Sequence, residues 1–236
     1  MREPVVFLPA MMCDARLFGP LIADLSRDHA VMCAPVTQGE RIEEIASGLL
    51  DVMPKRFALA GLGMGGIVAL EISRRAPDRV SRLALMDTTP LADTPQQAAA
   101  RDPQIIRVKT GKLDEVMADE VKLADLAPGP HRAEILALLT DMAQGLGPEC
   151  YIRQARAMQR RRDQQTTLRK IAVPTLVMCG AHDAIWPIKR HNFMAELIPG
   201  AKLQVIDGAG HLPPLEQPDL VGAALRRWLT EPLVLR

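Results

Sequence analysis

Aromatic residues are scarce in this sequence of 236 residues, because Phe, Trp and Tyr together make up only 3%. The core and any ligand pocket must therefore be filled mainly by aliphatic side chains and by the 12 methionines, which suits aliphatic better than flat aromatic ligands. An excess of one charge is missing too, since 29 Lys and Arg stand against 28 Asp and Glu. The basic field that attracts nucleic acid or an anionic membrane is absent, so neither is an expected partner.

Paired cysteines and long apolar runs are also lacking. The four cysteines stand far apart with no C-x-x-C pair, so neither a zinc site nor a redox motif is expected, and buried free thiols are the simpler interpretation. The apolar run near the N-terminus is bracketed by Pro4 and Pro9 and followed by Asp14, which fits neither a signal peptide nor a membrane span. We expect a cytoplasmic protein with no metal and no cofactor.

Short, uniformly apolar runs are present, and helical patterns alternate with them. The runs lie at residues 5–8, 30–34, 57–60, 83–86, 175–179 and 202–206. The helical patterns lie at 18–26, 41–53, 65–76, 189–198 and 218–230. Runs of this kind are typical of parallel strands buried on both faces. The alternation predicts an α/β fold with a mainly parallel sheet of about six strands and flanking helices.

The alternation stops between residues 90 and 170. Four helical patterns follow one another there, separated by Pro and Gly, at 94–109, 112–127, 130–145 and 148–163. This composition predicts an inserted helical cap, or lid, over 90–170. The core is then formed by residues 1–89 and 171–236, and the insertion is placed where it can cover the carboxyl edge of the sheet.

The segment "GLGMGG" at 61–66 lies between a predicted strand and a predicted helix, and it fits two kinds of turn. Its G-x-G-x-x-G spacing is that of a dinucleotide-binding loop, and Asp87 stands where the ribose-binding acid is expected. That fingerprint normally follows the first strand of its unit, however, whereas two predicted strands precede it here. A dinucleotide-binding protein is therefore kept only as an alternative.

The other interpretation is a nucleophile turn, G-x-S-x-G, in which a strained central residue projects from the top of a sheet. Residues 57–70, "FALAGLGMGGIVAL", resemble this turn of the α/β-hydrolase superfamily at every position except the centre, where Gly63 stands in place of serine. The glycines at 61, 65 and 66 match the small residues that the turn needs.

Two later segments support the resemblance independently. "GAHDAIWP" follows the predicted strand 175–179, and the resemblance assigns the triad acid to Asp183. "DGAGHLPP" follows the strand 202–206, and the resemblance assigns the catalytic base to His211. The order nucleophile, acid, histidine is that of this superfamily. Asp87 is a rival acid, because some members of the fold carry theirs after that earlier strand.

The resemblance also implies an oxyanion hole and an acyl pocket. One main-chain donor maps to Met64, directly after the nucleophile position, and the other to Met11, in the loop after the first strand. The usual His-Gly opening of that loop is replaced by Pro9-Ala10. Trp186, in the acid loop, is a candidate for lining the acyl pocket or for packing beneath the cap.

The implied activity is hydrolysis of a small carboxylic ester or related acyl substrate through a Ser-Asp-His triad. The layout resembles that of the pimeloyl-carrier-protein methyl esterases. Arg153, Arg156 and Arg160 share one helical face, which is either a solvated face or a surface for an acidic carrier protein. The sequence leaves open whether the natural substrate is an ester, thioester, lactone or amide.

Gly63 removes the nucleophile from this scheme, so the chain as written is expected to be inactive or nearly so. One explanation is a deliberate Ser-to-Gly substitution in a serine hydrolase, which we favour because the remaining machinery is intact. The other is a natural non-hydrolytic member of the fold that binds a ligand or uses His211 directly as a base.

Overall fold

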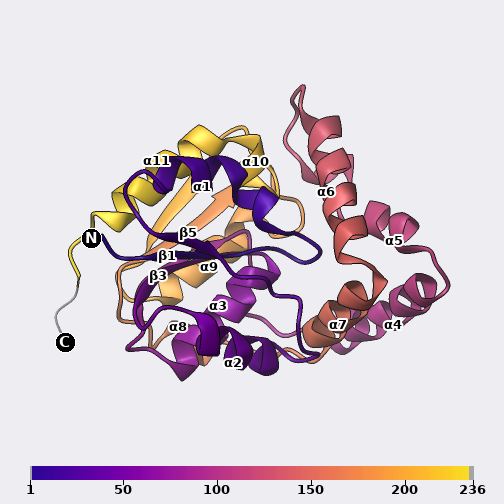
Figure 1. Cartoon of the computed structure of the whole chain (residues 1–236), viewed down its shortest axis with the longest axis horizontal. Helices are drawn as coiled ribbons and strands as arrows, with labels where there is room; N and C mark the ends of the chain where they lie inside the picture. The colour runs from indigo at the N-terminus through magenta and orange to yellow at the C-terminus, as the bar shows by residue number, and fades with distance from the viewer. Residues whose placement is uncertain (1, 234–236) are drawn as a thin grey trace.

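The computed structural model describes residues 2–233, which contain one sheet of six strands, all pairing in parallel (Figure 1). The order across the sheet is β2-β1-β3-β4-β5-β6. The strands are β1 Val5–Leu8, β2 Val31–Cys33, β3 Phe57–Leu62, β4 Val80–Met86, β5 Thr175–Gly180 and β6 Lys202–Ile206. The predicted α/β fold with about six parallel strands is confirmed.

Helices cover both faces of the sheet (Figure 1). On one face, α1 Gly19–Leu25 and α11 Pro218–Leu229 bury an apolar cluster with inward residues such as Phe7. On the other, α2 Ile42–Val52, α3 Met64–Arg75 and α9 Ile188–Leu197 bury a second cluster with residues such as Val6 and Leu8. Consecutive residues of β1 thus point into different clusters, because side chains alternate along a strand.

Residues 90–170 are called the insertion from here on. Most of its helices lie to one side of the sheet (Figure 1). They are α4 Pro95–Lys109, α5 Leu113–Glu120, the short 3₁₀ turn η2 Leu123–Asp125, α6 Arg132–Leu146 and α7 Pro148–Gln159. The short α8, Gln165–Leu168, instead contacts α3 and α9 of the core. The insertion has an apolar cluster of its own, and the fully buried Met12 from the loop after β1 belongs to it.

Several boundaries differ from the sequence prediction, among them the end of α7 at Gln159 and not at residue 163. Two of the differences have identifiable reasons. β4 begins at Val80, three residues before the predicted strand, because the buried Arg82 pairs with Glu3 at 2.5 Å. The helix predicted over 112–127 ends at Glu120, and the chain then turns through η2. There the main-chain oxygen of Asp125 accepts a hydrogen bond from the amide of His211, at 2.8 Å.

The short elements η1 Ala15–Phe18 and α10 Pro213–Glu216 complete the described secondary structure. Among residues 2–233, no helix combines the length and the apolar character that a membrane crossing requires.

Candidate functional site

The loops that follow β1, β3, β5 and β6 meet at the carboxyl edge of the sheet, where parallel α/β sheets place their ligands. Gly63 directly follows β3, Asp183 lies three residues beyond β5, and His211 lies in the loop after β6. Because β3 is central and all strands are parallel, these loops converge although their residues are far apart in the sequence.

Gly63 adopts a backbone conformation that side chains disfavour, with φ 55° and ψ −118°. Its amide donates to the main-chain oxygen of Met86 at 3.0 Å, which fixes the turn against the end of β4. Gly65 is required for close approach, since a Cβ there would lie 2.1 Å from the main-chain oxygen of Leu8. A Cβ at Gly63 would lie 3.3 Å from the Cβ of Ala10, so a small side chain fits at the centre of the turn only tightly.

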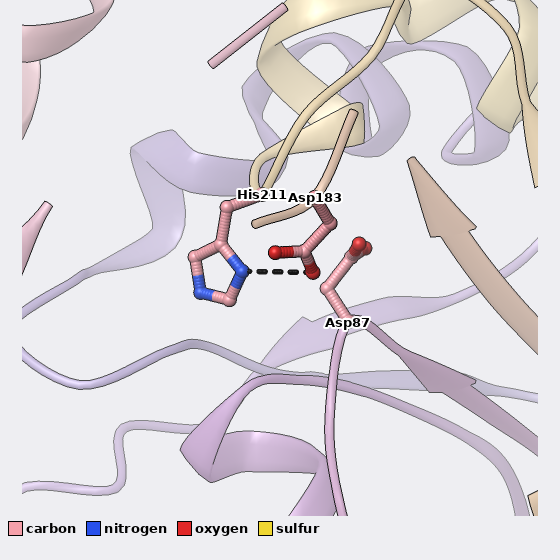
Figure 2. Close-up of side chains that lie close together, drawn as sticks. All are labelled: Asp87, Asp183 and His211. Carbon is pink, nitrogen blue, oxygen red and sulfur yellow. Dashed lines mark hydrogen bonds and ion pairs between the residues drawn. The ribbon is translucent and has the colours of Figure 1, made fainter. Parts of the chain in front are cut away.

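Asp183 and His211 form a buried hydrogen-bonded pair, with 3.1 Å between Asp183 Oδ2 and His211 Nδ1 (Figure 2). The other oxygen of Asp183 accepts the amides of Ile185 and Trp186, at 2.9 and 3.0 Å. Burial alone would raise the pKa of Asp183, but the hydrogen bond and charge of His211 and the Trp186 amide hold it below its ordinary value. Asp183 is thus held as a carboxylate that orients the imidazole.

Asp87 lies next to Asp183, on the side away from His211 (Figure 2). It is fully buried, and its Oδ1 accepts the amide of Gly180 at 3.0 Å. Burial, and then the charge of Asp183, raise the pKa of Asp87 well above its ordinary value. The rival acid is therefore a neutral carboxyl beside the acid that holds the histidine, and it exposes no surface to a nucleotide ribose.

The two candidate oxyanion donors, Met64 and Met11, line the same cavity as Gly63. Met64 begins α3, where main-chain amides have no partner within the helix. Met11 lies in a turn closed by the amide of Cys13 and the oxygen of Ala10, 3.1 Å apart. The next residue, Met12, has a φ of 55°, which is unusual for a side chain of this size.

A buried glutamine of the insertion forms a hydrogen bond with the loop after β1. Gln154 of α7 accepts the amide of Met12 at 2.9 Å and donates to the main-chain oxygen of Val36 at 3.0 Å. Its side chain is fully buried. Gln154 belongs to no sequence motif, and the signal that could have identified it is a polar residue four positions from both Cys150 and Met158 on the apolar face of α7.

A cavity of about 160 Å³ joins these parts. Gly63, Met64, Met11 and His211 line one part of it. Apolar side chains from the core loops and the insertion line its walls, among them Met117, Val121, Leu139, Met158, Ile185 and Trp186. The remaining polar side chains in the lining belong to Arg101, Glu120 and Tyr151 of the insertion, which the sequence analysis did not single out because only the packing of three helices brings them together.

Other predicted residues lie elsewhere. Arg156 and Arg160 both pair with Glu40, at 2.5 and 3.2 Å, and Arg153 donates to the main-chain oxygen of Thr37 at 3.0 Å. This arginine face is therefore directed at the segment after β2. His182 and Asp207, which adjoin the motif residues in sequence, are exposed.

His191 of α9, which belongs to no sequence motif, is linked to the Gly63 turn through Thr88. It is fully buried, and its Nε2 accepts the amide of Thr88 at 3.2 Å. The hydroxyl of Thr88 in turn donates to the main-chain oxygen of Gly63 at 2.6 Å. Burial lowers the pKa of His191 to about 4, so the ring is neutral and serves as an acceptor.

Curated proteins similar to this chain include methyl ester esterases. The pimeloyl-[acyl-carrier protein] methyl ester esterase of Aromatoleum aromaticum is 29% identical over 201 residues, covering 77% of this chain and 77% of that protein. The protein of the same description from Neisseria meningitidis is 28% identical over 201 residues, covering 82% of this chain and 77% of its own length.

Solved structures agree on the fold, and the family profile spans most of the chain. A thermophilic esterase from Thermogutta terrifontis superposes with a TM-score of 0.86 at 27% identity, covering 96% of this chain and 89% of that one. The enol-lactonase from Burkholderia xenovorans also gives 0.86, at 24% identity, covering 98% and 92%. The profile of the Alpha/beta hydrolase family matches residues 5–224. The chain is therefore a member of the Alpha/beta hydrolase family.

Proposed function

We propose that this chain is a carboxylic ester hydrolase framework that binds an acyl ester beside Gly63 and lacks the nucleophile needed to cleave it quickly. The observation that carries the proposal is the strained turn at Gly63, which lines one cavity together with His211 of the buried Asp183 pair. The similarity to methyl ester esterases supports an ester as the substrate class.

With serine at position 63, the residues take the roles of acyl transfer. His211 removes the hydroxyl proton, Asp183 stabilises the imidazolium, and the oxyanion is held by the main-chain amides of Met64 and Met11. The first turn of α3 adds its positive end to the same place. Water then releases the acyl group with His211 again acting as the base.

Cys13 does not replace the missing serine. Its thiol lines the same cavity, but burial and then the charge of Asp14 raise its pKa to about 12. A thiol with such a pKa holds almost no thiolate near neutral pH and is a poor nucleophile. Binding and the oxyanion hole alone supply about 10³–10⁴-fold catalysis over water, so slow turnover is expected of the Gly63 chain.

The test is Gly63→Ser, with Gly63→Ala as the matched control. Both variants add a Cβ at a left-handed φ and are expected to lose about 1–2 kcal/mol of unfolding free energy. Only the serine variant should become labelled by a fluorophosphonate and hydrolyse short acyl p-nitrophenyl esters far faster than the parent. Circular dichroism establishes that each variant is folded at the assay temperature.

Two results decide against the proposal. A folded Gly63→Ser protein that is inert towards both reagents removes the esterase assignment. A second candidate is that His211 acts directly as a base on water, and the observation behind it is the intact pair of His211 with Asp183 beside Gly63. This candidate is favoured if the parent is as active as the serine variant and His211→Gln abolishes that activity.

A further inference from the structure

The cavity beside Gly63 has a polar region within the insertion. Arg101 of α4, Glu120 at the end of α5 and Tyr151 of α7 line it together with mostly apolar side chains. Polar groups are costly to place against apolar surface unless they find hydrogen-bond partners. The partners that these three side chains have, and those that they lack, therefore indicate what the region can bind.

Arg101 carries a charge that its own partner only partly neutralises. Its Nε and Nη2 donate to the two oxygens of Asp93, at 2.6 and 3.4 Å, and its side chain is 20% exposed. The same carboxylate pairs with Arg161 at 2.7 Å, and the side chains of Asp93 and Arg161 are both 2% exposed. Because two guanidinium groups share one buried carboxylate, an excess of positive charge remains on the side where Arg101 lines the cavity.

Glu120 supplies the opposite charge and forms no ion pair with Arg101 among residues 2–233. One of its oxygens accepts the hydroxyl of Tyr151 at 2.6 Å. Burial and the charge of Glu120 raise the pKa of Tyr151, so the phenol stays protonated as the donor. Within residues 2–233, no ion pair of 4.0 Å or less joins Arg101 to Glu120. A guanidinium and a carboxylate thus line one cavity and leave bonding capacity towards it.

We propose that this region binds a neutral group that accepts a hydrogen bond from Arg101 and donates one to Glu120, such as a primary carboxamide at the far end of an acyl ester. The assignment rests on the proposed function for the ester end. Arg101 and Arg161 balance Asp93 and Glu120 in charge, so a neutral dipolar group completes the region without adding net charge.

Other groups are disfavoured for definite reasons. A carboxylate can accept from Arg101, but it has no hydrogen to donate to Glu120 and is repelled by it. An ammonium group can donate to Glu120, but it cannot accept from Arg101 and is repelled by it. A branched alkyl group of the same shape leaves both charged side chains without the hydrogen bonds that the carboxamide supplies.

The experiment measures binding to the chain as it stands, so it does not depend on turnover. Three methyl esters of similar shape are compared by isothermal titration: methyl 6-amino-6-oxohexanoate, monomethyl adipate and methyl 6-methylheptanoate. Homologues with two or three methylene groups in place of four allow for the length of the cavity. The carboxamide is expected to bind at least about tenfold more tightly than either analogue of equal length, through charge-assisted hydrogen bonds.

Two variants test the assigned partners. Arg101→Met keeps the aliphatic stem and leaves Asp93 paired with Arg161, and it should abolish the preference for the carboxamide over the alkyl ester. Glu120→Gln keeps an acceptor for Tyr151 and removes the negative charge, so it should shift the preference towards monomethyl adipate. Arg107→Met, on the same helix but paired with Asp119, is the control and should leave all three affinities unchanged.

Equal affinities of the parent for the three esters, or unchanged ratios in both variants, overturn the assignment. Hydrolysis by the Gly63→Ser variant separates this result from the proposed function. If that variant hydrolyses simple esters while the parent has no carboxamide preference, only the polar region is wrongly assigned. If that variant is inert while the preference is present, the polar region stands and the esterase assignment fails.

Discussion

His191 combines complete burial with an acceptor role, so protonating it in the folded state is costly. Its pKa is about 4, against about 6.5 for an unfolded histidine. As the pH falls below about 6.5, the unfolded chain binds this proton first, and stability decreases until the folded ring also titrates near pH 4. The nearby charge of Asp183 favours protonation, and that of His211 opposes it, but burial is the larger effect.

We therefore expect the parent to lose about 2 kcal/mol of unfolding free energy between pH 7 and pH 5 through this residue. His191→Gln retains an acceptor for the Thr88 amide and should lack that part of the loss. Urea unfolding at both pH values gives the difference, and effects of the carboxylates cancel between parent and variant. The exposed His131→Gln serves as the control; identical pH dependence in the His191 variant and the parent contradicts the assignment.

The residues of the site differ in how far the sequence could point to them. Asp183 and His211 lie in motifs that follow predicted strands, so parallel topology alone brings them to one edge. His191 and Gln154 lie in helices whose patterns carry no such motif. Their roles come from hydrogen bonds to residues 103 and 142 positions away in the chain, which depend on the final packing.

Helix α7 is connected to the loop after β1 by more than apolar packing. Gln154 satisfies the amide of Met12 and the oxygen of Val36, while the side chain of Met12 lies in the apolar cluster of the insertion. These contacts help to hold Met12 at its left-handed φ, a conformation that is costly for a residue with a side chain. The conformation of Met11, one residue earlier, is therefore coupled to the position of α7.

Gln154→Leu is expected to cost about 2–4 kcal/mol of unfolding free energy, because two buried main-chain groups lose their partners. In the Gly63→Ser protein the same change should lower kcat more than it raises KM, if Met11 is the oxyanion donor that we propose, because its displacement then weakens oxyanion binding. Gln159→Leu, on the same helix and bonded to Ala98 of α4, should change both properties much less. Similar losses in the two variants would show that Gln154 matters only for packing.

At the level of elements, the apolar pattern predicted every strand but not all their ends. Uniform apolarity cannot mark the first residues of β4, where Ser81 and Arg82 are buried with Glu3 as their partner. Likewise, the turn after α5 is held by Asp125, whose side chain accepts the amide of Lys122 at 2.7 Å and whose oxygen accepts that of His211. Long-range partners of this kind are invisible to local periodicity.

Across the whole molecule, the insertion holds both sides of the candidate site. Gln154 accepts the amide of Met12 on one side, and Asp125 accepts the amide of His211 on the other. The full set of residues that line the cavity could not be predicted from the sequence, because it depends on how four helices of the insertion pack over the core loops. The fold class, the approximate number of parallel strands and the motif residues were accessible from the sequence, whereas Arg101, Glu120 and Tyr151 required the assembled structure.

Hydrogen exchange should reveal this shared attachment. If the insertion opens as one unit, the amides of Met12 and His211 exchange with a common protection factor, which a bound ester raises for both. The amide of Asp87, bonded to Met178 within the sheet at 3.0 Å, should be protected more strongly and respond less. Exchange of Met12 and His211 with unrelated rates and unrelated responses to the ester would contradict the prediction.

The hydrogen bond from His211 to Asp125 sets an order of events for any ligand that enters by displacing the insertion. While the entrance is open, the histidine loop has lost its support, and the loop carrying Met11 has lost Gln154. The ligand then enters in one state of the molecule, and the site residues are positioned for reaction in another. The reacting geometry is restored only after the insertion has closed again. For a ligand that enters in this way, each cycle of entry and departure would rebuild the site around it.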